Sequence, residues 1–154
     1  MNEIVTEPAA AADVPRLLEI RHAAFAAHAP QAYSPAEVET LIADVDPDEL
    51  YAMAADARLF VARAGTVIVG LAGCVGDRLR HVYVDPGYTR RGIATVLVGR
   101  VEDEVRERTG RRLVRAGVAL HARGFYLANG YVLDRLATAW DGSSYAEMVK
   151  RLPT

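Results

Sequence analysis

A junction between a strand and a helix in the middle of the chain restricts the fold more than any other feature of the sequence. A valine-rich strand pattern ends at Val84, and the turn sequence Asp-Pro-Gly follows it at positions 85–87. Over residues 92–108 the pattern becomes helical, because apolar side chains recur at every fourth position. These positions are Ile93, Leu97, Val101 and Val105. A chain with this junction packs a helix against a sheet, which favours a mixed α/β fold over a helical bundle or a β-sandwich.

The same periodicities predict the other elements. Strands are expected at residues 3–7, 58–63, 67–77, 79–86, 112–120, 131–140 and 144–152. Helices are expected at residues 13–29, from residue 34 onward, at 92–108 and at 121–130. A capping box of Ser34 and Glu37 begins the second helix, and Gly110 is the expected end of the third. The predicted order is therefore βααβββαβαββ, with the acidic segment 44–50 interpreted as a solvated loop.

Length, composition and charge limit the class of protein. With 154 residues, of which 51% are hydrophobic, the chain is expected to form a single domain over residues 1–154. The formal net charge of −2 argues against nucleic acid and anionic membranes as partners. Cys74 is the single cysteine, and the sequence shows neither a signal-peptide pattern nor a long apolar run. We therefore expect a soluble, cytoplasmic protein in which Cys74 is a buried thiol.

The start of the helix at residue 92 is suited to an anion. The first backbone N–H groups of a helix lack intrahelical acceptors, and Gly92 and Ala94 leave them accessible. Arg90 and Arg91 add two positive charges beside them. The alternative interpretation is an ordinary turn with solvated arginines. Nucleotide motifs do not fit, because the chain contains no G-x-x-x-x-G-K-[ST] sequence and its closely spaced strand glycines do not open a helix.

Two segments of the chain together resemble a known family. "LRHVYVDPGYTRRGIATVLVGRVEDE" at residues 79–104 and "VALHARGFYLANGY" at 118–131 resemble the paired motifs of the GNAT superfamily of acetyl-CoA-dependent N-acetyltransferases. The resemblance implies an α/β (α+β) fold, with a mixed, mostly antiparallel sheet of about seven strands flanked by about four helices. The sequence departs from the family in two places. Thr89 stands at the first position of the pattern [QR]-x-x-G-x-[GA], and Ala119 stands where related sequences often carry a polar residue.

The resemblance also implies a function and a set of cofactor contacts. The function is direct transfer of an acetyl group from acetyl-CoA to a primary amine of a small molecule or peptide, with no metal. By similarity, the backbone of Val82, Tyr83 and Val84 pairs with the pantetheine arm, whereas the valine side chains are core. The implied diphosphate contacts are Thr89, Arg90, Arg91, Gly92, Ile93, Ala94 and Thr95. A non-catalytic acyl-CoA-binding or regulatory module is the alternative function.

Catalytic roles follow from the same resemblance. Tyr126 matches the family tyrosine, and a phenol that is protonated at neutral pH can serve as general acid toward the thiolate. His81 is a candidate general base because its ordinary pKa is near neutral, although water can take that role. Acceptor contacts could come from four aromatic residues: Tyr33, Tyr51, Tyr83 and Trp140.

The sequence leaves two further questions. Asp44, Asp46 and Asp48 alternate as at the start of a calcium loop, but Glu49 and Ala55 stand where that loop needs Gly and Glu. We therefore expect no metal there. The chain is expected to be a monomer or a homodimer, because an exposed strand in its C-terminal half could pair with a second copy.

Overall fold

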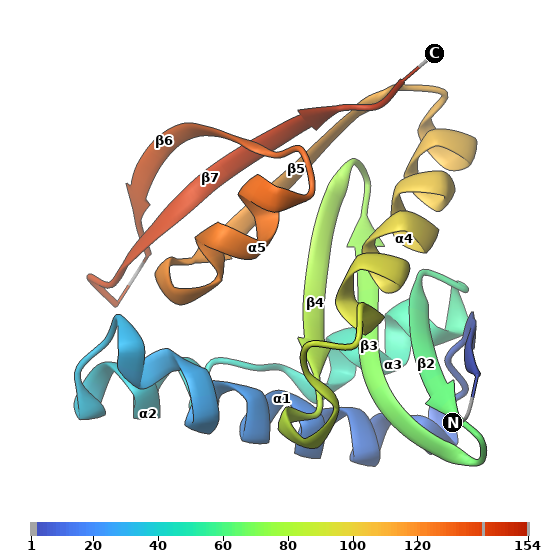
Figure 1. Cartoon of the computed structure of the whole chain (residues 1–154), viewed down its shortest axis with the longest axis horizontal. Coiled ribbons are helices and arrows are strands. Elements are labelled where there is room, and N and C mark those ends of the chain that lie inside the picture. The colour runs from blue at the N-terminus through green and yellow to red at the C-terminus, as the bar shows by residue number, and fades with distance from the viewer. Residues whose placement is uncertain (1–2, 140, 154) are drawn as a thin grey trace.

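The computed structural model describes residues 3–139 and 141–153, and its strands form one seven-stranded sheet in the order β1-β2-β3-β4-β5-β7-β6 (Figure 1). The strands are β1 (Ile4–Pro8), β2 (Leu59–Ala64), β3 (Val67–Val75), β4 (Arg78–Val84), β5 (Leu113–Ala119), β6 (Val132–Thr138) and β7 (Ser144–Arg151). Every neighbouring pair is antiparallel except β4 and β5, which are parallel. The mixed, mostly antiparallel sheet predicted from the sequence is therefore confirmed.

Helices cover both faces of this sheet. They are α1 (Val14–His28), α2 (Pro35–Ala43), α3 (Pro47–Ala55), α4 (Ile93–Thr109) and α5 (Arg123–Ala128). Apolar residues of α1 and α3, such as Leu17 and Leu50, share one core with β2 and β3, whereas Leu97 and Val101 of α4 belong to a second core. Within the described residues, none of the helices combines the length and the apolar character that crossing a bilayer requires.

The prediction of a loop over residues 44–50 is wrong, because α3 begins at Pro47. Asp46 caps this helix, and its carboxylate accepts a hydrogen bond from Asp48 N–H at 2.9 Å. Proline at the first helical position and acidic residues in the first turn both favour a helix start. Asp46 therefore belongs to a helix cap, and the described residues form five α-helices where about four were expected.

Strands β4 and β5 pair only at one end. Their register joins Arg78 to Arg115 and Leu79 to Ala116, and no further pairs follow. On its other edge β4 carries an irregularity relative to β3, at the position of His81, whose φ is 60°. A bulge bends its strand and redirects the neighbouring side chains. The two strands consequently separate beyond Leu79 and leave an opening in the sheet.

Candidate active site

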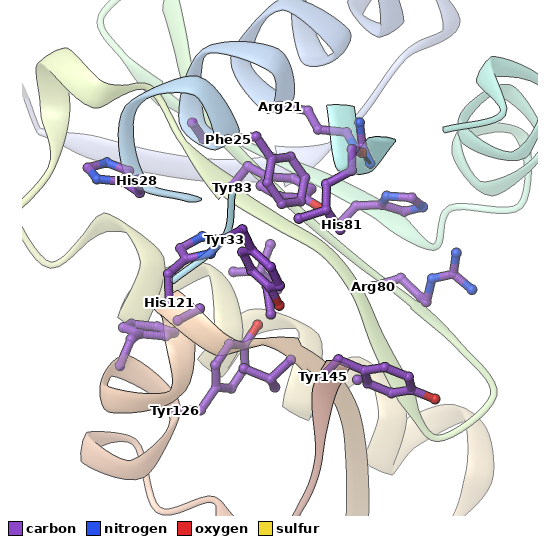
Figure 2. A pocket seen from close by; sticks show the side chains of 18 of the residues that line it. Arg21, Phe25, His28, Tyr33, Arg80, His81, Tyr83, His121, Tyr126 and Tyr145 are labelled. Atoms are coloured by element: carbon purple, nitrogen blue, oxygen red, sulfur yellow. Dashed lines mark hydrogen bonds between the residues drawn. The ribbon is translucent and has the colours of Figure 1, made fainter. Parts of the chain in front are cut away.

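A cavity of about 820 Å³ occupies this opening between β4 and β5 (Figure 2). Its walls come from α1, β4, β5, α5 and the start of β7. A smaller cavity of about 330 Å³ lies at the start of α4. The two share four lining residues, Val84, Thr89, Ala94 and Phe125. The N-terminus of α4 therefore adjoins the opening in the sheet.

The first turn of α4 presents unpaired backbone donors. Gly92 is the N-cap with a φ of 76°, and no side chain caps the helix. The first intrahelical bond runs from Val96 N–H to Gly92 O, so the amides of residues 93–95 have no acceptor within the helix. A Cβ on Gly92 would meet no atom within 4 Å, so its surroundings are open. This is the local geometry in which a helix N-terminus binds an anion.

The turn before α4 is held by side chains. Asp85 accepts a hydrogen bond from Gly87 N–H at 2.9 Å and pairs with Arg16 of α1 at 2.7 Å. Burial opposes the ionised form, but these two contacts hold the pKa of Asp85 below its ordinary value. Thr89 donates its hydroxyl proton to Pro86 O at 3.2 Å, and the Arg91 guanidinium lies 5.0 Å from the centre of the Tyr88 ring. The Thr89 hydroxyl is therefore engaged within the turn.

The edge of β4 that faces the opening carries free backbone groups. Asp85 N–H donates to Val69 O on β3 at 2.8 Å. Successive residues of a strand direct their backbone groups to opposite edges, so Val84 N–H and C=O point to the side from which β5 has separated. The side chains of Val82 and Val84 pack against the core shared with α4, and Tyr83 packs toward α1.

Tyr126 lies on α5 with 8% of its surface exposed. Its ring makes edge contacts with Phe125 and Tyr131, at 5.1 and 5.4 Å between ring centres. Its hydroxyl makes no hydrogen bond within the described residues, and Figure 2 shows it directed into the cavity toward Tyr33. Burial raises the pKa of Tyr126, so the phenol keeps its proton at neutral pH.

His81 also lines the cavity, but its ring takes another direction. Its Nε2 lies 3.0 Å from Glu49 Oε1 on α3, and in Figure 2 the ring points away from Tyr126. Burial lowers the pKa of His81 despite the opposing hydrogen bond to Glu49, so the imidazole is neutral at pH 7. Glu49 was not expected from the sequence, although the Asp46 and Pro47 cap that places it on a helix is visible there.

The acceptor contacts proposed from the sequence occupy different places. Tyr33 and Tyr83 line the cavity, whereas Tyr51 is exposed on α3 and is not among the lining residues. Trp140 lies outside the described residues. Cys74 is buried, as expected, and burial raises the pKa of its thiol, which does not favour a nucleophilic role.

Three further polar residues of the cavity were missed: Arg21, His28 and His121. Each has a buried side-chain nitrogen with no hydrogen-bond partner among the described residues. For Arg21 the sequence held a signal, because Leu17, Arg21 and Phe25 are spaced four apart on the apolar stripe of α1. A charged residue at a core position of a helix is a candidate for a polar role.

Comparison with known proteins identifies the family to which this fold belongs. The sequence model of one family, described as the acetyltransferase (GNAT) domain, matches residues 29–152 of this chain. No curated protein gives a significant match in sequence.

Solved structures share the fold at low identity. A GCN5-related N-acetyltransferase from Rhodopseudomonas palustris, described also as an aminotransferase of class II, has a TM-score of 0.88 and 24% identity over 99% of this chain and 98% of that one. The PaiA N-acetyltransferase from Thermoplasma acidophilum, solved with coenzyme A, has a TM-score of 0.74 and 17% identity over 97% of this chain and 99% of that one. Rv2747 from Mycobacterium tuberculosis, solved with CoA and NLQ, has a TM-score of 0.69 and 16% identity over 97% of this chain and 99% of that one. Because the domain model spans most of the sequence, the chain belongs to the GNAT acetyltransferase domain family.

Proposed function

We propose that this protein transfers an acetyl group from acetyl-CoA directly to a primary amine of a small molecule or peptide. The observation that supports the proposal most directly is that two features lie in adjoining cavities, which share four lining residues. The uncapped first turn of α4 adjoins the opening between β4 and β5, and Tyr126 points into that opening. Two of the related structures contain coenzyme A, which supports the same assignment.

The cofactor-binding roles follow from the backbone. The amides of Ile93, Ala94 and Thr95 would hold the diphosphate, with Arg90 and Arg91 supplying positive charge nearby. In the β4 stretch 82–84, Val84 directs its backbone groups to the opening and would pair with a pantetheine amide in place of the missing strand contacts, whereas Tyr83 directs its backbone to β3. An N–H group of this edge would also stabilise the thioester oxygen as negative charge develops on it.

Two side chains are proposed to move protons. His81 would accept a proton from the amine before attack on the thioester carbon. Since its Nε2–H faces Glu49, the neutral ring keeps its lone pair on Nδ1. Tyr126 would donate its phenolic proton to the sulfur when the C–S bond breaks, and the resulting phenolate would take up the proton that the amine nitrogen loses as the amide forms. The products are an N-acetyl amine and free coenzyme A.

Two measurements test this proposal in sequence. Acetyl-CoA at about 100 times its Kd should stabilise the folded protein by about 2.7 kcal/mol in thermal unfolding. A panel of primary amines with acetyl-CoA should then release free thiol. Absence of stabilisation would contradict the cofactor site, and binding without thiol release from any amine would instead indicate a non-catalytic acyl-CoA-binding module.

A further inference from the structure

Arg21 is a buried cation on the wall of the large cavity. It has 5% of its surface exposed and lines the large cavity but not the smaller one at α4. Its Nη1 donates to Ile42 O at 2.8 Å, and its Nη2 donates to Leu41 O and Asp44 O at 2.8 and 2.9 Å. The guanidinium therefore caps the C-terminal end of α2, where a positive charge is favourable.

The charge of Arg21 lacks the compensation that other arginines of this cavity receive. Arg78 pairs with Glu147 at 2.6 Å, and Arg80 pairs with Glu49 at 3.0 Å. The three hydrogen bonds that Arg21 donates at 2.8–2.9 Å all go to backbone carbonyls, and the phenol of Tyr83, which also interacts with the guanidinium, carries no net charge. Asp44 lines the same cavity, but its carboxylate forms no ion pair with Arg21 among the described residues. A buried ion without a counter-ion is costly, so an anion in the cavity would be strongly favoured beside Arg21.

The surroundings of Arg21 also leave one donor unused. Its Nε is buried and has no hydrogen-bond partner among the described residues. The rings of Phe25 and Tyr83 lie 4.8 and 5.7 Å from the guanidinium carbon (Figure 2). Tyr83 cannot supply negative charge at neutral pH, because burial raises the pKa of its phenol. The unused Nε–H and the charge of the guanidinium thus lie together on this wall of the cavity, beside two aromatic rings.

We propose that the acceptor amine also carries a carboxylate, as a free amino acid does, and that this carboxylate binds Arg21 through Nε. The inference rests on the proposed acetyl transfer and names its substrate class. A single guanidinium with one unused buried donor matches a singly charged group better than a phosphate dianion. Arg21 lies against the ring of Tyr83, and it lines the same cavity as Val84, whose backbone faces the proposed thioester site.

Matched acceptors test this inference separately from the proposed function. Thiol release is measured with free L-amino acids and, for each, its carboxamide and its decarboxylated amine, for example L-phenylalanine, L-phenylalaninamide and phenethylamine. We expect kcat/KM to be at least about tenfold higher for the carboxylate member of the best set, as one hydrogen bond to a charged group predicts. Equal or better rates with the plain amines would overturn the inference while leaving acetyl transfer intact.

Variants of Arg21 give the second arm of the experiment. R21Q should bring the ratio of kcat/KM for the amino acid to kcat/KM for its decarboxylated amine close to one. R21K should retain part of the preference for the amino acid. The ratio is measured within one preparation, so it does not depend on how much of the variant is folded. R63Q is the control and should leave the ratio unchanged, because Arg63 forms its two ion pairs away from the cavity, with Glu7 on β1 and with Asp13 before α1.

A purely structural role gives a different result. If Arg21 only caps α2, R21Q will slow all three members of a set by the same factor, and the inference fails. Calorimetric titration of the CoA-saturated protein with L-phenylalanine and phenethylamine provides a readout without turnover. Selective binding of the amino acid, lost in R21Q, supports the carboxylate site even if no thiol is released, which would contradict the proposed function alone.

Discussion

Gly92 occupies a backbone conformation in which a side chain is strained. Its φ of 76° lies in the left-handed region, where other residues pay about 1–2 kcal/mol. We expect G92A to lower the free energy of unfolding by about 1 kcal/mol, measured by urea denaturation. G99A is the matched control, because Gly99 lies within α4, has open space around its Cα and has no positive φ. In G99A the free energy of unfolding should rise by about 0.5–1 kcal/mol, because alanine has the higher helix propensity. A lower stability of G99A would contradict this explanation.

A substitution of Tyr126 should affect catalysis without affecting the stability of the fold. Its hydroxyl makes no hydrogen bond within the described residues, so Y126F removes no internal contact of the folded protein. We expect kcat for acetyl transfer to fall at least about 100-fold, because general acid catalysis contributes on that scale. The affinity for acetyl-CoA and the Tm should change little. Unchanged turnover would remove the proposed role of Tyr126.

The neighbouring Tyr131 should show the reverse pattern. Its hydroxyl donates to Glu102 at 2.7 Å in the core, and Lys150 is the other partner of that carboxylate. Y131F leaves Glu102 with one buried contact fewer, and we expect a loss of about 1–3 kcal/mol in unfolding free energy with kcat unchanged. A variant that lost turnover but not stability would show that the two tyrosines had been assigned the wrong way round.

Elements whose signals are local were predictable from the sequence. The capping box of Ser34 and Glu37 is formed at α2, and Gly110 ends α4 with a φ of 67°. The start of α3 also had a local signal, with Asp46 as cap and Pro47 at the first helical position, although the segment was predicted to be a solvated loop. Local patterns therefore suffice for element order when each cap is considered as a possible helix start.

The shape of the site was less predictable, since it depends on pairings between distant segments. Nothing near Leu79 in sequence indicates that β5 separates there, because the register is set by residues more than thirty positions away. Similarly, Arg21 caps α2 through carbonyls at residues 41, 42 and 44, and only its place on the apolar stripe of α1 hinted at burial. Which polar groups remain unpartnered can be known only after the tertiary contacts are known.

The burial of His81 on β4 predicts a pH dependence of stability. Burial lowers the pKa of His81 below its ordinary value of 6.5, so the unfolded chain binds a proton more readily than the folded one. The unfolding free energy should therefore decrease as the pH falls from 6.5 toward the pKa of the folded state. H81Q should make this decrease shallower in urea titrations at several pH values. H22Q, at an exposed position on α1, is the control, and an equal slope in H81Q and the wild type would contradict the assignment.

At the scale of the whole molecule, the cavity lies between segments that are distant in the chain. Helices α1 and α2 form one wall, and β5, α5 and the start of β7 form another. Tyr33, just before α2, joins these walls: its hydroxyl donates to Ser144 O at 2.9 Å and accepts from Leu120 N–H at 2.8 Å. Burial raises the pKa of Tyr33, so this double contact persists at neutral pH.

Removing that hydroxyl should loosen the cavity. Y33F leaves a partly buried N–H group and a carbonyl without this partner, and we expect the free energy of unfolding to fall by about 1–2 kcal/mol. The amide of Leu120 should exchange with solvent faster in NMR measurements, because it loses its acceptor. KM for the amine should rise, whereas the affinity for acetyl-CoA should hold, since its proposed contacts lie at α4 and β4. Y51F, at an exposed tyrosine of α3, should change none of these quantities. Loss of stability without faster exchange at Leu120 would show that Tyr33 acts through packing and that the two walls are held together elsewhere.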